Sequence, residues 1–369
     1  MDQNTKRTYF DDLRITSLDE VLRSPSHIKN WNKLICKSAD IYYTLEYLSA
    51  IQINENGNIF LAQYTHGNSV IIYPFVLRAI PLSLKTKTPA NPLFDIRTPY
   101  EFGGPLYFGP SSDRKIVQNN FITQFGRYCR KADIVSEFIR FNPPLKNHVG
   151  WENWYDISVS CANVVIELTH SEDKILAAFR RDHRRDTLLA QTHDINIERE
   201  IVTQNSFLKF RDIYINSMDQ LGADSYYYFS DDYFTQLSNL GKERVSLYVM
   251  KDINDNYIGG AIFLHSGDYS HYHLSAMGQK FREKRASSLL FYQAALDFKK
   301  MNSTILHLGG AAKSQTGLLH FKEGFSKSRL DYFIGRRIHN ETNYNLLCDM
   351  QFVSSQKLAE KRYFPAYRG

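Results

Sequence analysis

The stretch LHLGGAAKSQTGLLHFKEGF, residues 306–325, combines a short apolar run, a pair of glycines and a lysine between two phenylalanines. Residues 304–308 predict a β-strand that ends at Gly309 and Gly310, after which a polar loop leads to Lys322. Because glycine has no side chain, a ligand can approach the backbone closely there, and this favours a site. The same residues are equally compatible with a solvated surface lysine between two core phenylalanines.

Length and composition limit the class of protein. A chain of 369 residues predicts two domains, and 43% hydrophobic residues can fill two cores. The four cysteines are widely spaced and form no CxxC pair, which favours a reducing compartment. The N-terminus lacks the apolar segment of a signal peptide, and no apolar run approaches the ~20 residues that cross a bilayer. We therefore expect a cytoplasmic protein without an integral membrane segment.

The charge is mildly basic, with 45 basic and 39 acidic residues and a net charge of +6. This excess favours an anionic ligand but does not indicate DNA binding. Four arginines of the segment FRRDHRRD occupy two faces of a predicted helix in i, i+4 pairs: Arg180, Arg181, Arg184 and Arg185. Guanidinium groups match phosphate oxygens, so a pyrophosphate or a nucleic-acid backbone is the expected partner. The alternative is a solvated helix that its two aspartates partly neutralise.

The chain reads as two halves with a similar order of elements, separated by an irregular stretch at 145–160. The first half predicts helices at 41–50 and 114–131, strands at 58–64, 69–77 and 133–141, and a loop rich in proline and glycine at 89–110. The second half predicts strands at 163–168, 245–250, 257–264, 269–276, 304–308 and 332–338, and helices at 179–198, 207–222 and 287–301. The similar order suggests an ancient duplication.

At this point the chain resembles the GNAT (Gcn5-related N-acetyltransferase) superfamily. The order βββ-α-β-loop-β and residues 277–310, MGQKFREKRASSLLFYQAALDFKKMNSTILHLGG, carry this resemblance. The whole chain is similar to the FemAB-like branch through YPFVLRAIP (73–81), FDIRTPYEFGGPL (94–106), DIVSEFIRFNPPLKN (133–147), the arginine-rich helix and LHLGG…HFKEGF. The resemblance implies an α+β fold of two tandem GNAT-like domains, each a mixed, mostly antiparallel sheet flanked by helices.

The resemblance places the domains at residues 1–155, a degenerate domain on the acceptor side, and 156–335. The tail 336–369 is expected to pack back on the first domain. The implied activity is transfer of an acyl or aminoacyl group to an amine, often in peptidoglycan or surface-polysaccharide assembly.

The resemblance also implies roles for single residues. Lys322 would stabilise the transition state or the donor, and Arg184 or Arg185 would contact acceptor phosphates. Tyr100 would line the acceptor site, and Tyr272 lies on the strand that diverges from its neighbour in GNAT folds.

Three further residues are candidates for proton transfer or amine recognition. Asp95 and Glu101 are the carboxylates nearest Tyr100 in sequence. His307, at the end of the strand 304–308, is a candidate general base or a hydrogen-bonded structural histidine.

The donor site departs from the family pattern. GNAT proteins bind the CoA pyrophosphate on a turn with two glycine or small positions before a helix. The corresponding residues here are REKRAS, in which the predicted donor contacts are Arg282, Arg285, Ala286 and Ser287. FemAB enzymes that use aminoacyl-tRNA also lack the glycine turn. Acyl-CoA, most simply acetyl-CoA, and charged tRNA therefore both remain open as donors.

Other patterns give no stronger reading. His271 and His273 share a strand face at a spacing compatible with a metal, but no third ligand is evident, so no metal is predicted. No nucleophile elbow, dinucleotide fingerprint or P-loop occurs. We predict an N-acyltransferase that acts on an amino sugar or peptide attached to a phosphate-bearing carrier such as a nucleotide sugar. The alternatives are an aminoacyl-tRNA-dependent transferase and a non-catalytic GNAT-like module that binds a nucleotide or RNA.

Overall fold

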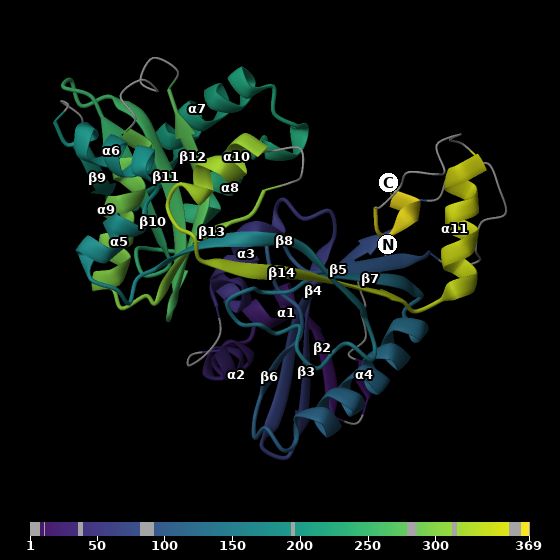
Figure 1. Ribbon diagram of the computed structural model, residues 1–369. Helices are drawn as coiled ribbons and strands as arrows, with labels where there is room; N and C mark the ends of the chain where they lie inside the picture. Colours follow the sequence, from purple (N-terminus) through teal and green to yellow (C-terminus); the bar gives the residue numbers. More distant parts are fainter. Residues whose placement is uncertain are drawn as a thin grey trace. The chain divides into compact units, whose positions relative to one another are not determined.

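The chain forms two compact units (Figure 1). The computed structural model describes residues 8–10, 12–35, 40–81, 92–192, 196–278, 286–311, 316–353 and 363–368. Unit 1 comprises Met1–Leu34, Glu55–Ser160 and Tyr332–Gly369, and unit 2 comprises Ile35–Asn54 and Cys161–Asp331. The segment Ile35–Asn54 therefore lies in unit 2, although the chain on both sides of it belongs to unit 1.

Unit 1 contains a sheet in the order β1-β2-β3-β4-β5-β7, continued by the C-terminal part of β14, with β6 paired to β4. Neighbouring strands are antiparallel except for β5 and β7. The strands are β1 (Thr8–Phe10), β2 (Leu13–Ser17), β3 (Asn58–His66), β4 (Ser69–Ala79), β5 (Phe94–Arg97), β6 (Leu106–Phe108), β7 (Ile134–Arg140) and β14 (Arg329–Ile338). β14 pairs with β7 through Ile334–Ile338 and begins within unit 2.

The helices of unit 1 are α1 (Leu18–Leu22), α2 (Pro25–Ile35), α4 (Arg114–Lys131), α11 (Glu341–Val353) and the short η4 (Ala366–Arg368). The bounds of α4 agree with the prediction, because its apolar residues recur at helical spacing. Its buried Phe121 and Phe125 pack with Tyr73 and Phe75 of β4 in one aromatic core.

Unit 2 contains a sheet in the order β8-β13-β12-β11-β10-β9. β12 and β13 are parallel, whereas the other neighbours are antiparallel. The strands are β8 (Asp156–Glu167, in unit 2 from Cys161), β9 (Asn196–Glu200), β10 (Val245–Lys251), β11 (Tyr257–Ser266), β12 (Tyr269–Met277) and β13 (Ile305–Gly309). The three-stranded meander predicted from period-2 alternation is thus present as β10-β11-β12.

Helices cover both faces of this sheet (Figure 1). On β11, a Cβ at Gly260 would meet Phe210 of α7 at 3.2 Å, whereas the next residue, Ala261, belongs to the core around α9. Alternate residues of the strand therefore serve opposite faces. The helices are η1 (Ile41–Tyr43), α3 (Leu45–Gln52), α5 (Glu172–Ala178), α6 (Arg181–Ala190), α7 (Gln204–Leu221), η2 (Ser225–Tyr227), α8 (Asp231–Ser238), α9 (Ala286–Lys300) and α10 (Thr316–Glu323).

Three predicted elements need correction. The loop predicted at 89–110 contains the short strands β5 and β6, whose alternation is hidden by the surrounding prolines and glycines. The helix predicted at 179–198 ends at Ala190, and β9 follows, because Glu198 and Glu200 pair with Lys251 of β10. Lys322 lies in helix α10 and not in a loop. Within the described residues, no helix is both long and apolar enough to cross a bilayer.

Candidate functional site

The central feature of unit 2 is the point where the parallel strands β12 and β13 separate. Their last paired residues are His271 and His307. β12 then continues beside β11 as far as Met277, while Gly309 of β13 pairs with Val164 of β8. The β11–β12 ladder also shifts register at Ile262/Phe263. Divergence and irregular pairing at one place are typical of sheet regions that bind ligands.

Lys322 occupies this point. Its Nζ donates to the carbonyl oxygen of Gly310 at 2.6 Å and lies 5.4 Å from the ring centroid of Tyr272. A Cβ at Gly309, whose φ is +73°, would lie 3.3 Å from the same Nζ. The lysine is only 7% exposed, so the alternative of a solvated surface lysine is wrong. The glycine pair gives Lys322 room beside the backbone at the end of β13.

A chain of buried hydrogen bonds joins the two strands just before they separate. His271 Nε2 lies 2.7 Å from Asp40 Oδ1, and His271 Nδ1 lies 3.3 Å from His307 Nδ1. His307 Nε2 lies 3.0 Å from Asn163 Nδ2, and the Cys161 thiol donates to Asn163 Oδ1 at 3.5 Å. One assignment satisfies each ring nitrogen: Asn163 donates to His307, His307 to His271, and His271 to Asp40.

This assignment requires a neutral imidazole at His307. Burial, reinforced by the nearby His271 and Lys322, holds the pKa of His307 well below its usual range. His307 is therefore a neutral base at physiological pH, and its Nε2 accepts a hydrogen bond from Asn163. The direct role that these contacts support is to fix the ends of β12 and β13 beside Lys322.

The two histidines considered as metal ligands, His271 and His273, contact different residues. His271 contacts Asp40 and His307, whereas His273 Nε2 lies 2.7 Å from the hydroxyl of Tyr233. Burial, followed by His271, lowers the pKa of His273 to about 3. Burial likewise lowers the pKa of His265 to about 4.

We expect these buried histidines to make unit 2 sensitive to acid. A histidine with a pKa of 6.5 in the unfolded chain and about 3 in the folded chain binds more protons when unfolded. The contribution of each such histidine to the free energy of unfolding should be constant above pH 6.5. Below that pH it should fall by about 1.4 kcal/mol per pH unit. Urea unfolding at several pH values tests this, and His273→Gln should flatten the slope. The same change at the exposed His170 should not.

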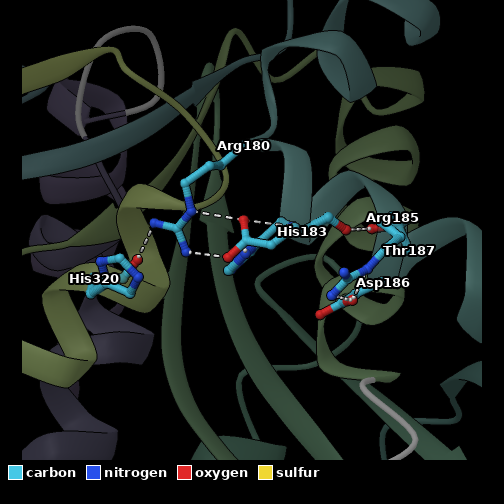
Figure 2. Close-up of polar contacts among 7 residues, drawn as sticks. Arg180, His183, Arg185, Asp186, Thr187 and His320 are labelled. Carbon is cyan, nitrogen blue, oxygen red and sulfur yellow. Dashed lines mark hydrogen bonds and ion pairs between the residues drawn. The ribbon is translucent and has the colours of Figure 1, made fainter.

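Helix α6 carries the predicted phosphate-binding arginines (Figure 2). Arg180, at its N-cap, donates to both carboxylate oxygens of Asp182 at 2.7 and 2.8 Å and to the carbonyl of His320 at 3.1 Å. These hydrogen bonds hold the pKa of Asp182 well below its usual range. Arg184 donates to the carbonyl of Ala177 at 3.4 Å. Because it donates to His320, Arg180 joins the start of α6 to α10.

Arg185 differs from Arg180 in its exposure. Its side chain is 62% exposed, and its nearest ionic partner is the neighbouring Asp186 at 3.1 Å. Figure 2 shows Arg185 and Asp186 on the side of α6 away from His320. Arg181 and Arg185 are thus the exposed arginines of this segment, whereas Arg180 and Arg184 are half-buried.

His183 links α6 to the helix that carries Lys322. Its ring lies 5.5 Å from that of Phe321 and 4.7 Å from that of Phe325, and a Cβ at Gly324 would lie 2.2 Å from ring atoms. The backbone N–H of Arg180 donates to the carbonyl of Gly324 at 2.8 Å. The Phe-Lys-Glu-Gly-Phe motif therefore needs its glycine for close packing against α6.

The candidates from the acceptor side lie in unit 1. Asp95 of β5 is fully buried, accepts from Arg78 Nε at 2.8 Å and also pairs with Arg368. Its contacts are internal ones, typical of a structural carboxylate. The backbone N–H of Tyr100 donates to Glu55 at 2.6 Å, and Glu101 adopts a left-handed φ of +62°. Tyr100 and Glu101 are half-buried.

The predicted donor contacts fall at the start of α9. Ala286 is its first residue and is buried, and Ser287 is half-buried. Arg282 and Arg285 lie outside the described residues. Sequence reasoning missed four residues of this region: Asp40, Asn163, Cys161 and His183. Only His183 had a local signal, which is the position of Gly324 in the lysine motif that packs against it.

The fold has clear counterparts among solved structures. The chain is similar to FemX, with a TM-score of 0.65 and 12% identity over 86% of this chain and 98% of FemX. It is also similar to the C-terminal domain of a putative lysylphosphatidylglycerol synthetase from Agrobacterium fabrum, with a TM-score of 0.53 and 12% identity over 91% and 97% of the two chains. No family model and no curated protein matches its sequence. The predicted FemAB-like fold is confirmed.

Proposed function

We propose that a protein with this FemX-like fold transfers an acyl group to an amine at the point where β12 and β13 separate. The observation that carries the proposal is the burial of a lysine, Lys322, at the end of β13 beside Tyr272 and two glycines. A buried cation is favourable where negative charge develops during a reaction. One structural counterpart is named as a domain of a putative lysylphosphatidylglycerol synthetase, and that name agrees with this chemistry.

The chemistry follows from acyl transfer. A neutral amine attacks the carbonyl carbon of the donor, negative charge develops on the carbonyl oxygen, and the bond to the leaving atom breaks as the amine loses a proton. Lys322 would stabilise that oxygen or the departing group, because a charge acts strongly where water is excluded. His307, His271 and Asp40 would hold the strand ends in position.

The donor is proposed to be an acyl-CoA, most simply acetyl-CoA. Helix α9 starts at Ala286 and runs for 15 residues, so its N-terminal amides suit a pyrophosphate. Arg282 and Arg285 would supply charge in place of the glycine turn. A second candidate is aminoacyl transfer from charged tRNA, which the missing glycines and the likeness to FemX favour.

The acceptor is proposed to be the amine of an amino sugar or peptide on a phosphate-bearing carrier such as a nucleotide sugar, in envelope or surface-polysaccharide synthesis in the cytoplasm. Arg184 and Arg185 would contact its phosphates. Tyr100, Glu101 and Asp95 of unit 1 keep the acceptor-side roles that the resemblance implies, although the burial of Asp95 favours an indirect one.

The test is an assay of thiol release from acetyl-CoA with a panel of amino-sugar nucleotides, run beside an assay with charged tRNA. Product with acetyl-CoA supports the proposal, and product with charged tRNA alone supports the second candidate. If neither donor acylates any amine, while nucleotides or RNA still raise the Tm, the chain is a non-catalytic binding module.

Replacing both Arg184 and Arg185 by glutamine should raise KM for a phosphate-bearing acceptor about tenfold and leave kcat unchanged. The Tm should change little, because Arg185 is exposed and Arg184 makes only a long hydrogen bond to the carbonyl of Ala177. The measurement compares acceptors with and without the phosphate. An equal rise in KM for both kinds of acceptor would show that α6 does not recognise the phosphate.

A further inference from the structure

Unit 1 contains a half-open cavity of about 190 Å³ between helix α2 and the sheet. Residues at regular spacing on three elements line it. β2 and the residue before it contribute Asp12, Arg14 and Thr16, and β3 contributes Leu61, Gln63 and Thr65, in each case at every second position. α2 contributes His27, Asn30 and Trp31, which share one helix face.

The polarity of this strand face is unusual for its position. A strand face covered by a helix normally carries apolar residues that pack against it. The opposite face of β2 follows that rule, since Leu13 and Ile15 are buried in the core of unit 1. The face toward α2 instead carries Arg14, opposite Gln63 of β3, and Thr16, opposite Leu61. Polar side chains that line a covered cavity are typical of a ligand site.

Arg14 supplies the charge. It is half-buried, its Nε donates to Thr16 Oγ1 at 3.2 Å, and its Nη2 lies 2.5 Å from His27 Nε2. Within the part of the chain that the structure describes, Arg14 has no carboxylate within ion-pair distance. Several half-buried or buried arginines of the same unit do have one: Arg78 and Arg368 pair with Asp95, and Arg97 pairs with Glu55.

We propose that this cavity binds the carboxylate of a small amino acid, free or at the end of a peptide. The guanidinium of Arg14 matches a carboxylate in bidentate fashion, and Asn30 and Gln63 carry neutral N–H donors. Leu61 and the buried Trp31 accommodate a short apolar side chain. Asp12, exposed at the rim, suits the ammonium of a free amino acid or a peptide N–H, and would repel a phosphate dianion.

The size of the cavity limits the ligand. Its volume of 190 Å³ corresponds to about six water molecules of liquid, which is room for one small residue. The cavity lies within unit 1, and its proposed ligand is independent of the transfer reaction proposed for unit 2.

Calorimetry with the full chain tests the proposal, using L-alanine, alanyl-alanine, L-alaninamide and inorganic phosphate. Binding of alanine identifies a free amino acid as the ligand, and binding of alanyl-alanine alone identifies a peptide end. Alaninamide, which lacks the carboxylate, should not bind. Arg14→Gln should weaken binding about 10- to 100-fold, because it removes a charge-assisted pair. Arg127→Gln, an exposed change on α4 of the same unit, should leave it unchanged.

A second variant tests the site without removing Arg14. Gln63 lies directly opposite Arg14 on the neighbouring strand, so Gln63→Glu supplies a carboxylate within the chain. This variant should have a higher Tm and no affinity for alanine or alanyl-alanine. The proposal is overturned if no carboxylate binds at millimolar concentration, if phosphate binds in its place, or if Arg14→Gln and Gln63→Glu leave the affinity unchanged.

Discussion

Replacing Lys322 by methionine should lower kcat for acyl transfer by roughly 10²- to 10³-fold, the usual cost of removing one group that stabilises a developing oxyanion. KM should change little, because the proposed interaction strengthens in the transition state. The fold should tolerate the change, since methionine fills similar space beside Tyr272, although the hydrogen bond to Gly310 is lost. Steady-state kinetics with the donor found active, together with a Tm measurement, provides the test.

The matched control is Lys242→Met, which removes an exposed lysine of the same unit and should leave kcat unaltered. A Lys322→Met protein that keeps its Tm and its full kcat would show that the buried lysine takes no part in the reaction. A protein with a much lower Tm would instead identify the lysine as a structural group.

Asp95→Ala should lower the free energy of unfolding by about 3–5 kcal/mol, because it leaves buried positive charge without its partner. Asp95 is fully buried, and Arg78, which is 9% exposed, has no other carboxylate partner among the described residues. Arg368 and the hydroxyl of Tyr367 also contact Asp95, so residues 363–368 should lose their anchor on unit 1. Urea unfolding measures the loss, and limited proteolysis reports the release of this segment.

Asp156→Ala is the matched control, since Asp156 is 72% exposed in its pair with Arg336. Its effect should stay within about 0.5 kcal/mol. If Asp95→Ala abolishes transfer while stability is retained, the carboxylate has the direct role that the family resemblance implies. A loss of stability with residual transfer assigns it to the structure of unit 1.

The sequence predicts those parts of the fold in which local periodicity agrees with the tertiary contacts. Helix α4 and the meander β10-β11-β12 have apolar residues at regular spacing, and they form close to the predicted bounds. β9 escapes prediction because its residues, Asn-Ile-Glu-Arg-Glu, are mostly charged. Its pairing depends on Lys251 of a strand some fifty residues later.

The candidate site, too, was only partly predictable from the sequence. The glycine pair and Lys322 are close in sequence, so their spacing signalled a site, and the divergence of the strand at Tyr272 followed from the family resemblance. Asp40 gave no signal, because 231 residues separate it from His271. Nor does the sequence distinguish Arg180 from Arg184, since the carbonyl that engages Arg180 belongs to His320, 140 residues away.

The segment Ile35–Asn54 constrains how the protein can be divided or recombined. The chain passes between the units at 34/35, 54/55, 160/161 and 331/332, so no single cut separates them. A fragment of residues 161–331 would lack Asp40 and leave His271 without its carboxylate. During synthesis, residues 35–54 must wait for more than a hundred later residues before their partners exist. Domain-swap chimeras of this fold should therefore carry the N-terminal segment with unit 2.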